Sequence, residues 1–231
     1  MGWTVGSLFS GIGGLDLGFH RAGFEVRWFC EADPFCRAVL AKHWPGVPCY
    51  EDVRTFHAPS RVDVLLGSCP CQPFSSASRG RKLGAADDRW LWYAMRRVIA
   101  EARPRVVVSE NVAQFDGVAL EQMVADLESD GYEVPAVLEI PACATGHDHW
   151  RPRLWVLGYA DRDREPGLPI HAKASGVSRG GGERVGVPAA HGLPPGLPRW
   201  RRAALQAIGN AVVPQVAEIV ARRVREILET A

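Results

Sequence analysis

The stretch Thr4-Val5-Gly6-Ser7-Leu8-Phe9-Ser10-Gly11-Ile12-Gly13-Gly14 stands at the start of the chain. Its first half is short, apolar and β-branched, as in a buried strand, and a glycine-rich turn follows at once. The next residues, up to Gly23, carry an apolar face and predict a helix. In this context the turn brings the backbone and the free N–H groups of a helix close to a ligand. The pattern is not the G-x-G-x-x-G dinucleotide fingerprint, so it favours a nucleoside-type cofactor; a tight turn without a ligand is the alternative.

Short apolar runs and amphipathic stretches then alternate along the chain. Strands are predicted at 4–9, 25–30, 62–66, 105–109, 132–140 and 154–159, and helices at 34–43, 89–102, 120–127, 200–208 and 215–228. Such alternation predicts an α/β fold with a mostly parallel sheet, helices on both faces and antiparallel strands near the end.

Polar side chains follow several of these predicted strands. Glu31 ends the second strand, where a carboxylate can accept hydrogen bonds from ribose hydroxyls, and Asp52 stands at a later strand end. Cys71 comes shortly after the strand at 62–66, and Glu110 directly after the strand at 105–109. If these strands are parallel neighbours, Glu110 lies beside Cys71. A cysteine at a strand rim can be a nucleophile, although an isolated cysteine is more often a small buried residue in a turn.

Composition and charge describe an ordinary globular protein of 231 residues with a formal net charge of +1. The sequence has no apolar run long enough for a membrane span, no export signal, and cysteines without metal-ligand spacing. We therefore expect a cytoplasmic protein with reduced thiols, no metal and no membrane partner. From Arg151 to Arg202 the charge is +6, ten Lys/Arg minus four Asp/Glu. This excess predicts a polyanion partner, with a solvated basic loop as the alternative.

Five short motifs occur in a fixed order along the chain: Phe9-Ser10-Gly11-Ile12-Gly13-Gly14, Pro70-Cys71-Gln72, Glu110-Asn111-Val112, Arg151-x-Arg153 and Gly209-Asn210-Ala211-Val212. In this order and at these spacings they resemble DNA cytosine-5 methyltransferases. The resemblance implies a Rossmann-like, S-adenosylmethionine-dependent methyltransferase fold. It also implies the residues that bind the cofactor: Phe9, Ser10, Gly11, Ile12, Gly13, Gly14, Leu15, Glu31, Ala32, Asp52, Val53, Pro70, Leu91, Asn210 and Ala211.

The resemblance further implies the chemistry of a covalent methyl transfer to cytosine. Cys71 would add to C6, Glu110 would bond the ring at N3 and the amine, Arg153 would bind O2, and Arg151 a phosphate. The target base would have to be flipped out of double-stranded DNA. Further DNA contacts are expected from Gln72, Ser75, Arg79, Arg81, Lys82, Arg199 and Arg201.

The chain departs from the family pattern at three places. Cys69 stands two residues before Cys71, where the family often has proline or another residue. His149 stands where glutamine is usual, and the target-recognition region, here the Gly- and Pro-rich segment 159–200, is short. We therefore expect a catalytic domain at 1–158, a flexible recognition segment at 159–200 and a C-terminal segment at 201–231 that docks back. We also expect short or relaxed sequence preference in a monomeric bacterial or phage protein, with room for a separate specificity subunit. A non-catalytic DNA-binding relic and an RNA cytosine methyltransferase remain alternatives.

Overall fold

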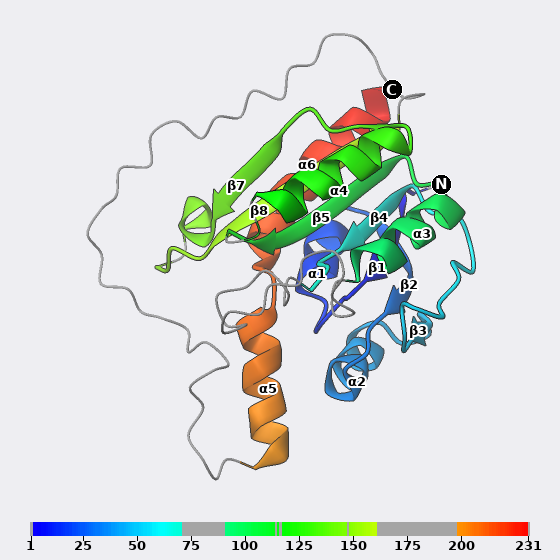
Figure 1. Cartoon of the computed structure of the whole chain (residues 1–231). Helices are drawn as coiled ribbons and strands as arrows, with labels where there is room; N and C mark the ends of the chain where they lie inside the picture. The colour runs from blue at the N-terminus through cyan, green and yellow to red at the C-terminus, as the bar shows by residue number, and fades with distance from the viewer. Residues whose placement is uncertain are drawn as a thin grey trace.

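The computed structural model describes residues 2–70, 91–113, 115, 117–146, 148–160 and 198–230. Strands and helices alternate through most of this length (Figure 1). The elements are β1 (Thr4–Leu8), α1 (Gly14–Arg21), β2 (Glu25–Cys30), α2 (Pro34–His43), β3 (Cys49–Tyr50), β4 (Val64–Gly67), α3 (Trp92–Ala102), β5 (Val106–Val112), α4 (Val118–Ser129), β6 (Tyr132–Glu133), β7 (Val137–Pro141), the 3₁₀ helix η3 (Ala142–Thr145), β8 (Pro152–Ala160), α5 (Arg199–Asn210) and α6 (Pro214–Thr230).

The strands form one sheet in the order β3-β2-β1-β4-β5-β8-β6, and β7 also pairs with β8. The strands from β3 to β5 run parallel to one another, whereas β8 is antiparallel to β5, β6 and β7. This arrangement confirms the predicted α/β fold with a mostly parallel sheet and an antiparallel end. It also makes β4 and β5 parallel neighbours, so the segments that follow them leave the sheet at the same edge.

Helices cover both faces of the sheet and close two apolar cores. In Figure 1, α3 and α4 lie over one face, while α1 and α6 lie behind the sheet. Trp28, Trp92 and Met95 are fully buried in the first core, and Phe19 and Trp155 in the second. Burial of side chains of this size contributes about 1.5–3 kcal/mol each to the stability of the fold, so the two cores stabilise the packing of the helices on the sheet.

The C-terminal helix α6 packs tightly against α1 because glycines allow a close approach. A Cβ atom on Gly18 would lie 2.4 Å from the Cβ atom of Ala217, and one on Gly14 would lie 2.4 Å from the carbonyl oxygen of Val212. The last segment of the chain therefore lies against the first glycine-rich turn. Among the described residues no single helix is long and apolar enough to cross a membrane; α5 and α6, bent by 42°, meet the length and composition criteria only as a pair.

Three local predictions differ from the structure. β5 extends to Val112, so Glu110 lies within the strand rather than after it, because antiparallel pairing with β8 continues that far. The strand predicted at 132–140 is two strands, β6 and β7, separated at Pro135, which has no N–H for a ladder hydrogen bond. The Gly209-Asn210 pair ends α5 instead of opening the last helix, which begins at Pro214, a residue suited to a first helical position.

Candidate active site

A cavity of about 770 Å³ opens at the carboxyl ends of β1, β2 and β4. Parallel sheets bind ligands in this position, and the volume suits a small-molecule ligand. Thirteen of the residues predicted to bind a cofactor line the cavity: Phe9, Ser10, Gly11, Gly14, Leu15, Glu31, Ala32, Asp52, Val53, Pro70, Leu91, Asn210 and Ala211. The other two, Ile12 and Gly13, do not line it; Gly13 backs onto the ring of Trp44 instead.

The glycine-rich turn is fixed to the end of β2 by the carboxylate of Glu31. Its Oε2 accepts a hydrogen bond from the Gly11 N–H at 2.7 Å, and its Oε1 accepts one from the Asp33 N–H at 2.8 Å. Each carboxylate oxygen can accept a second bond, so both remain able to meet a ligand in the cavity. Phe9, at the start of the turn, has a positive φ of 55°, a strained conformation that such functional turns often hold.

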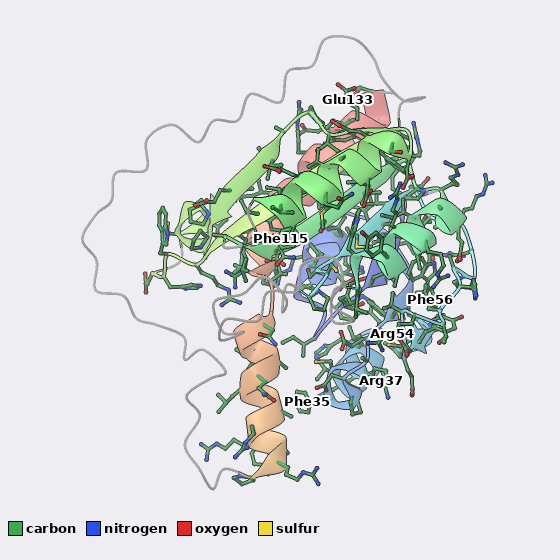
Figure 2. All side chains as sticks on the ribbon, viewed as in Figure 1. Phe35, Arg37, Arg54, Phe56, Phe115 and Glu133 are labelled. Carbon is green, nitrogen blue, oxygen red and sulfur yellow. The ribbon has the colours of Figure 1, made fainter. Side chains whose placement is uncertain are left out.

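Two arginines fix the side of the cavity that is formed by the segments after β2 and β3. Arg37 of α2 donates from Nη1 to the carbonyls of Glu31 and Ala32, and from Nη2 to Oε1 of Glu51 at 2.9 Å. Asp52 Oδ1 accepts a hydrogen bond from the backbone N–H of Arg54 at 2.9 Å. Figure 2 shows Arg37 and Arg54 on this side of the molecule. Arg37 was not predicted as a site residue, since a lone arginine on a helix carries no signal in the sequence.

Glu110 is a buried ionisable group in β5, and its partner Ser68 lines the cavity. Glu110 is 5% exposed, and its Oε1 lies 3.1 Å from Nε of Arg153 on the neighbouring strand β8. Burial raises the pKa of Glu110 above its usual range, and the guanidinium of Arg153, the Ser68 hydroxyl and the charge of Arg151 oppose this shift. A carboxyl group in such an environment can carry a proton and deliver it to a bound base.

Arg151 connects the sheet to the last segment of the chain. Its Nη2 donates hydrogen bonds to the carbonyl oxygens of Gly209 at 2.7 Å and Ala211 at 2.8 Å. Burial and the neighbouring charge of Arg153 lower the pKa of Arg151, and Glu110 partly opposes this. The predicted phosphate contact of Arg151 stays a prediction; in the structure its guanidinium holds the segment that forms one wall of the cavity.

The segment that leads to Cys71 is held by β5. The buried side-chain amide of Asn111 donates to the carbonyl of Cys69 at 2.8 Å, and its oxygen accepts a hydrogen bond from the Val112 N–H. Pro70 lines the cavity. The predicted nucleophile Cys71 lies outside the described residues, and so do the expected DNA contacts Gln72, Ser75, Arg79, Arg81 and Lys82.

The cavity also contains residues that were not predicted from the sequence. Gln206 and Ala207 line it from the same face of α5 as Asn210, three to four residues along the helix, so helical periodicity could have found them. Cys30 and Cys36 line it as well, but burial raises the pKa of each thiol to about 12, which makes them inert. Among the described residues no cluster of three or more His, Cys, Asp or Glu could hold a metal ion.

Comparison with known proteins agrees with this geometry. The sequence profile of the C-5 cytosine-specific DNA methylases matches residues 3–176. The chain is 37% identical over 175 residues to the type II methyltransferase M.AquIA of Picosynechococcus sp., covering 66% of this chain and 70% of that protein. It is 32% identical over 188 residues to the type II methyltransferase M.AgeI of Thalassovita gelatinovora, covering 74% of this chain but 43% of that one.

Solved structures share the fold over about half of their own length. A protein described as a DNA modification methyltransferase encoded within an E. coli prophage is 25% identical, with a TM-score of 0.58, and the match covers 69% of this chain and 47% of that one. A variant of Spodoptera frugiperda DNMT2 is 18% identical, with a TM-score of 0.60, covering 73% and 53%. The second likeness concerns the fold alone.

Proposed function

Since the chain belongs to the C-5 cytosine-specific DNA methylase family, we propose that it transfers a methyl group from S-adenosylmethionine to C5 of a cytosine flipped out of duplex DNA. The observation that carries this proposal is the buried Glu110–Arg153 pair, at 3.1 Å, beside a cavity of about 770 Å³. A cavity alone would suit many ligands. A carboxyl group of raised pKa beside it suits a base that must be protonated during the reaction.

The residues of the cavity fit S-adenosylmethionine in size and chemistry. Glu31 presents a fixed carboxylate to a ribose, and Asp52, in the segment that follows β3, presents another to which an adenine amine could donate. The glycine-rich turn is fixed at the edge of the cavity by the hydrogen bond from the Gly11 N–H to Glu31. When bound, S-adenosylmethionine supplies an electrophilic methyl group.

The chain's own residues make the cytosine reactive. C5 of cytosine is a weak nucleophile, so the thiolate of Cys71 adds to C6, forming an S–C6 bond, while a proton passes from Glu110 to N3. The resulting enamine has a nucleophilic C5. This carbon would take the methyl group from S-adenosylmethionine held by the residues of the cavity, so that the C5–CH3 bond would form as the S–CH3 bond breaks and a neutral thioether leaves. Loss of the C5 proton to a base then expels the thiolate, breaks the S–C6 bond and restores the ring; Glu110 recovers its proton from N3.

Arg153 has a positioning and an electrostatic role in this scheme. Its Nε lies 3.1 Å from Glu110 on the adjacent strand, so it orients the carboxyl group toward the base. A guanidinium there also favours charge developing on the O2 side of the cytosine ring. Asn111 sets the course of the backbone ahead of Cys71 through its hydrogen bond to the Cys69 carbonyl.

We further propose that sequence preference is short or relaxed. The stretch between β8, which ends at Ala160, and α5, which begins at Arg199, is short for base-edge readout. Most of the affinity would then come from phosphate contacts, which carry no sequence information. Methylation of a duplex library, read by bisulfite sequencing, tests this; strict modification of a long, fully specified motif would contradict it.

Covalent trapping on a duplex containing 5-fluorocytosine tests the mechanism, because fluorine at C5 cannot be removed as a proton and the adduct accumulates. We expect a stable protein–DNA adduct from the wild type with S-adenosylmethionine, none from Cys71→Ser, and adduct formation slowed about 100-fold or more for Glu110→Gln. The same duplex with unmodified cytosine is the control. Absence of an adduct from the wild type would contradict catalysis and favour a non-catalytic DNA-binding protein, and selective methylation of tRNA would favour an RNA enzyme.

A further inference from the structure

The first turn of α5 is an exposed basic surface outside the site described above. Its four consecutive residues Arg199, Trp200, Arg201 and Arg202 are all exposed, and Trp200 is 68% exposed. In Figure 1 this helix, in orange, projects away from the sheet, and Figure 2 shows Phe35 of α2 beside its middle. Within the part of the chain that the structure describes, the side chains of these three arginines make no ion pair and no hydrogen bond.

Three arginines of the neighbouring helix α6 form ion pairs. Arg222 pairs with Glu218, Arg223 with Glu226 and Arg225 with Glu229, each within one helical turn. Such pairs are what a solvent-facing helix normally carries. Helix α5 contains no aspartate or glutamate at all. Among the described residues nothing therefore neutralises the positive charge of the first turn of α5, and the exposed ring of Trp200 lies within that turn.

The other end of the same helix forms part of the cofactor cavity. Gln206, Ala207 and Asn210 line that cavity. At a rise of about 1.5 Å per residue, Arg201 lies about 14 Å along the helix axis from Asn210. Base pairs in a duplex are spaced by about 3.4 Å, so this distance corresponds to about four base pairs. A duplex that runs along α5 with its target base next to the cavity would therefore have phosphates within reach of the first turn.

We propose that the first turn of α5 is a docking surface for the phosphate backbone of the duplex DNA substrate, with Arg199, Arg201 and Arg202 on phosphates and Trp200 against the sugars or an exposed base. This inference rests on the proposed function. Charge complementarity selects this occupant: an apolar protein partner that covered Trp200 would have to bury the flanking arginines without counter-ions. Arginines interleaved with an aromatic ring suit a nucleic acid, because phosphates meet the cations and the ring packs on sugar or base.

The test is the salt dependence of binding to a fluorescent 24-base-pair duplex, measured by anisotropy. Each lost phosphate contact lowers the slope of log K against log salt by about 0.9. Arg201→Gln with Arg202→Gln should therefore lower the slope by about 1.8 and weaken binding about 10- to 100-fold near 0.1 M salt. Trp200→Ala should weaken binding without changing the slope, since it removes no charge.

Arg222→Gln with Arg223→Gln on α6 is the matched control, with the same charge change on a paired surface. It should leave slope and affinity within about twofold of the wild type. Calorimetric titration with S-adenosylmethionine, unchanged in every variant, shows that each is folded. An α5 double variant with the slope of the wild type would overturn the proposal, and so would tighter binding to an RNA duplex than to DNA.

These outcomes separate this inference from the proposed function. If the wild type binds and methylates the duplex, but the α5 double variant has the same salt slope as the wild type, the docking surface is refuted and the methyltransferase proposal stands. If the α5 double variant has a lower salt slope than the wild type, but the wild type transfers no methyl group, the docking surface stands and the catalytic proposal is refuted.

Discussion

The burial of Asp16 in α1, the helix that follows the glycine-rich turn, can be tested through the pH dependence of stability. Asp16 is fully buried, and neither of its carboxylate oxygens has a hydrogen-bond partner among the described residues. Burial raises the pKa of Asp16 from 3.8 to about 7; the charge of Glu31 adds to the shift, and the nearby Ser7 hydroxyl partly offsets it. Replacement by asparagine keeps the shape of the side chain and removes the titration.

The sign of the effect follows from proton binding. With a folded pKa near 7 and an unfolded pKa near 3.8, the folded state holds a proton that the unfolded state has lost. The contribution of Asp16 to stability is therefore complete below pH 4, declines as the pH rises, and is lost above pH 7. The slope is about 1.4 kcal/mol per pH unit within this window. Between pH 5 and 7 the wild type should lose roughly 2.3 kcal/mol relative to Asp16→Asn, somewhat less than about 1.4 for each of two units because Asp16 is already half ionised in the folded state at pH 7.

Urea unfolding of both proteins at pH 5, 6, 7 and 8 measures this difference. All other titrating groups are shared, so they cancel when one free energy of unfolding is subtracted from the other. The difference should change steadily in favour of Asp16→Asn up to pH 7 and then level off. A difference independent of pH would show that Asp16 is ionised throughout or exposed to water, and the reasoning about its burial would fail.

Three further substitutions test the packing, the cofactor cavity and the strand edge. Gly18→Ala should lower the urea midpoint, because a Cβ atom 2.4 Å from that of Ala217 costs about 1–3 kcal/mol in strain, more than the roughly 1 kcal/mol gained in helix propensity; an unchanged or higher midpoint would refute this close approach. Glu31→Gln should weaken S-adenosylmethionine binding about 10- to 100-fold in calorimetry, since the charged acceptor for the Gly11 and Asp33 N–H groups is lost; equal affinity would contradict the assigned role. Asn111→Ala should lower stability by about 1–3 kcal/mol and slow methyl transfer, because the Cys69 carbonyl loses its buried donor; a full transfer rate would show that this contact does not position the nucleophile segment.

The sequence predicted the main features of the fold because strand and helix periods are local. The strand at 25–30 and the helix at 34–43 agree with β2 and α2 residue for residue. The end of β5 could not be predicted, because Glu110 and Asn111 become part of a strand only through pairing with β8, more than forty residues later in the chain. Strand pairing between distant segments leaves no local periodicity in either one.

The cavity was predicted better on its N-terminal side than on its C-terminal side. The glycine-rich turn and Glu31 are close in sequence, and their contact follows from one βαβ unit. The contacts of Arg151 with Gly209 and Ala211 span about sixty residues, and nothing in Arg151-Pro152-Arg153 identifies backbone carbonyls as its partners. The basic first turn of α5, by contrast, is visible in the sequence: Arg199 and Arg201 were expected to contact DNA, and α5 contains no acidic residue. The structure adds that these side chains are exposed.

The most direct test of the central claim is the appearance of 5-methylcytosine in duplex DNA. Purified protein is incubated with S-adenosylmethionine carrying a trideuterated methyl group and a duplex library, and the nucleosides are analysed by mass spectrometry. We expect deuterated 5-methyldeoxycytidine with the wild type, none with Cys71→Ser, and a reduced amount with Glu110→Gln. Label in N4-methylcytosine or adenine, or equal label with Cys71→Ser, would contradict it.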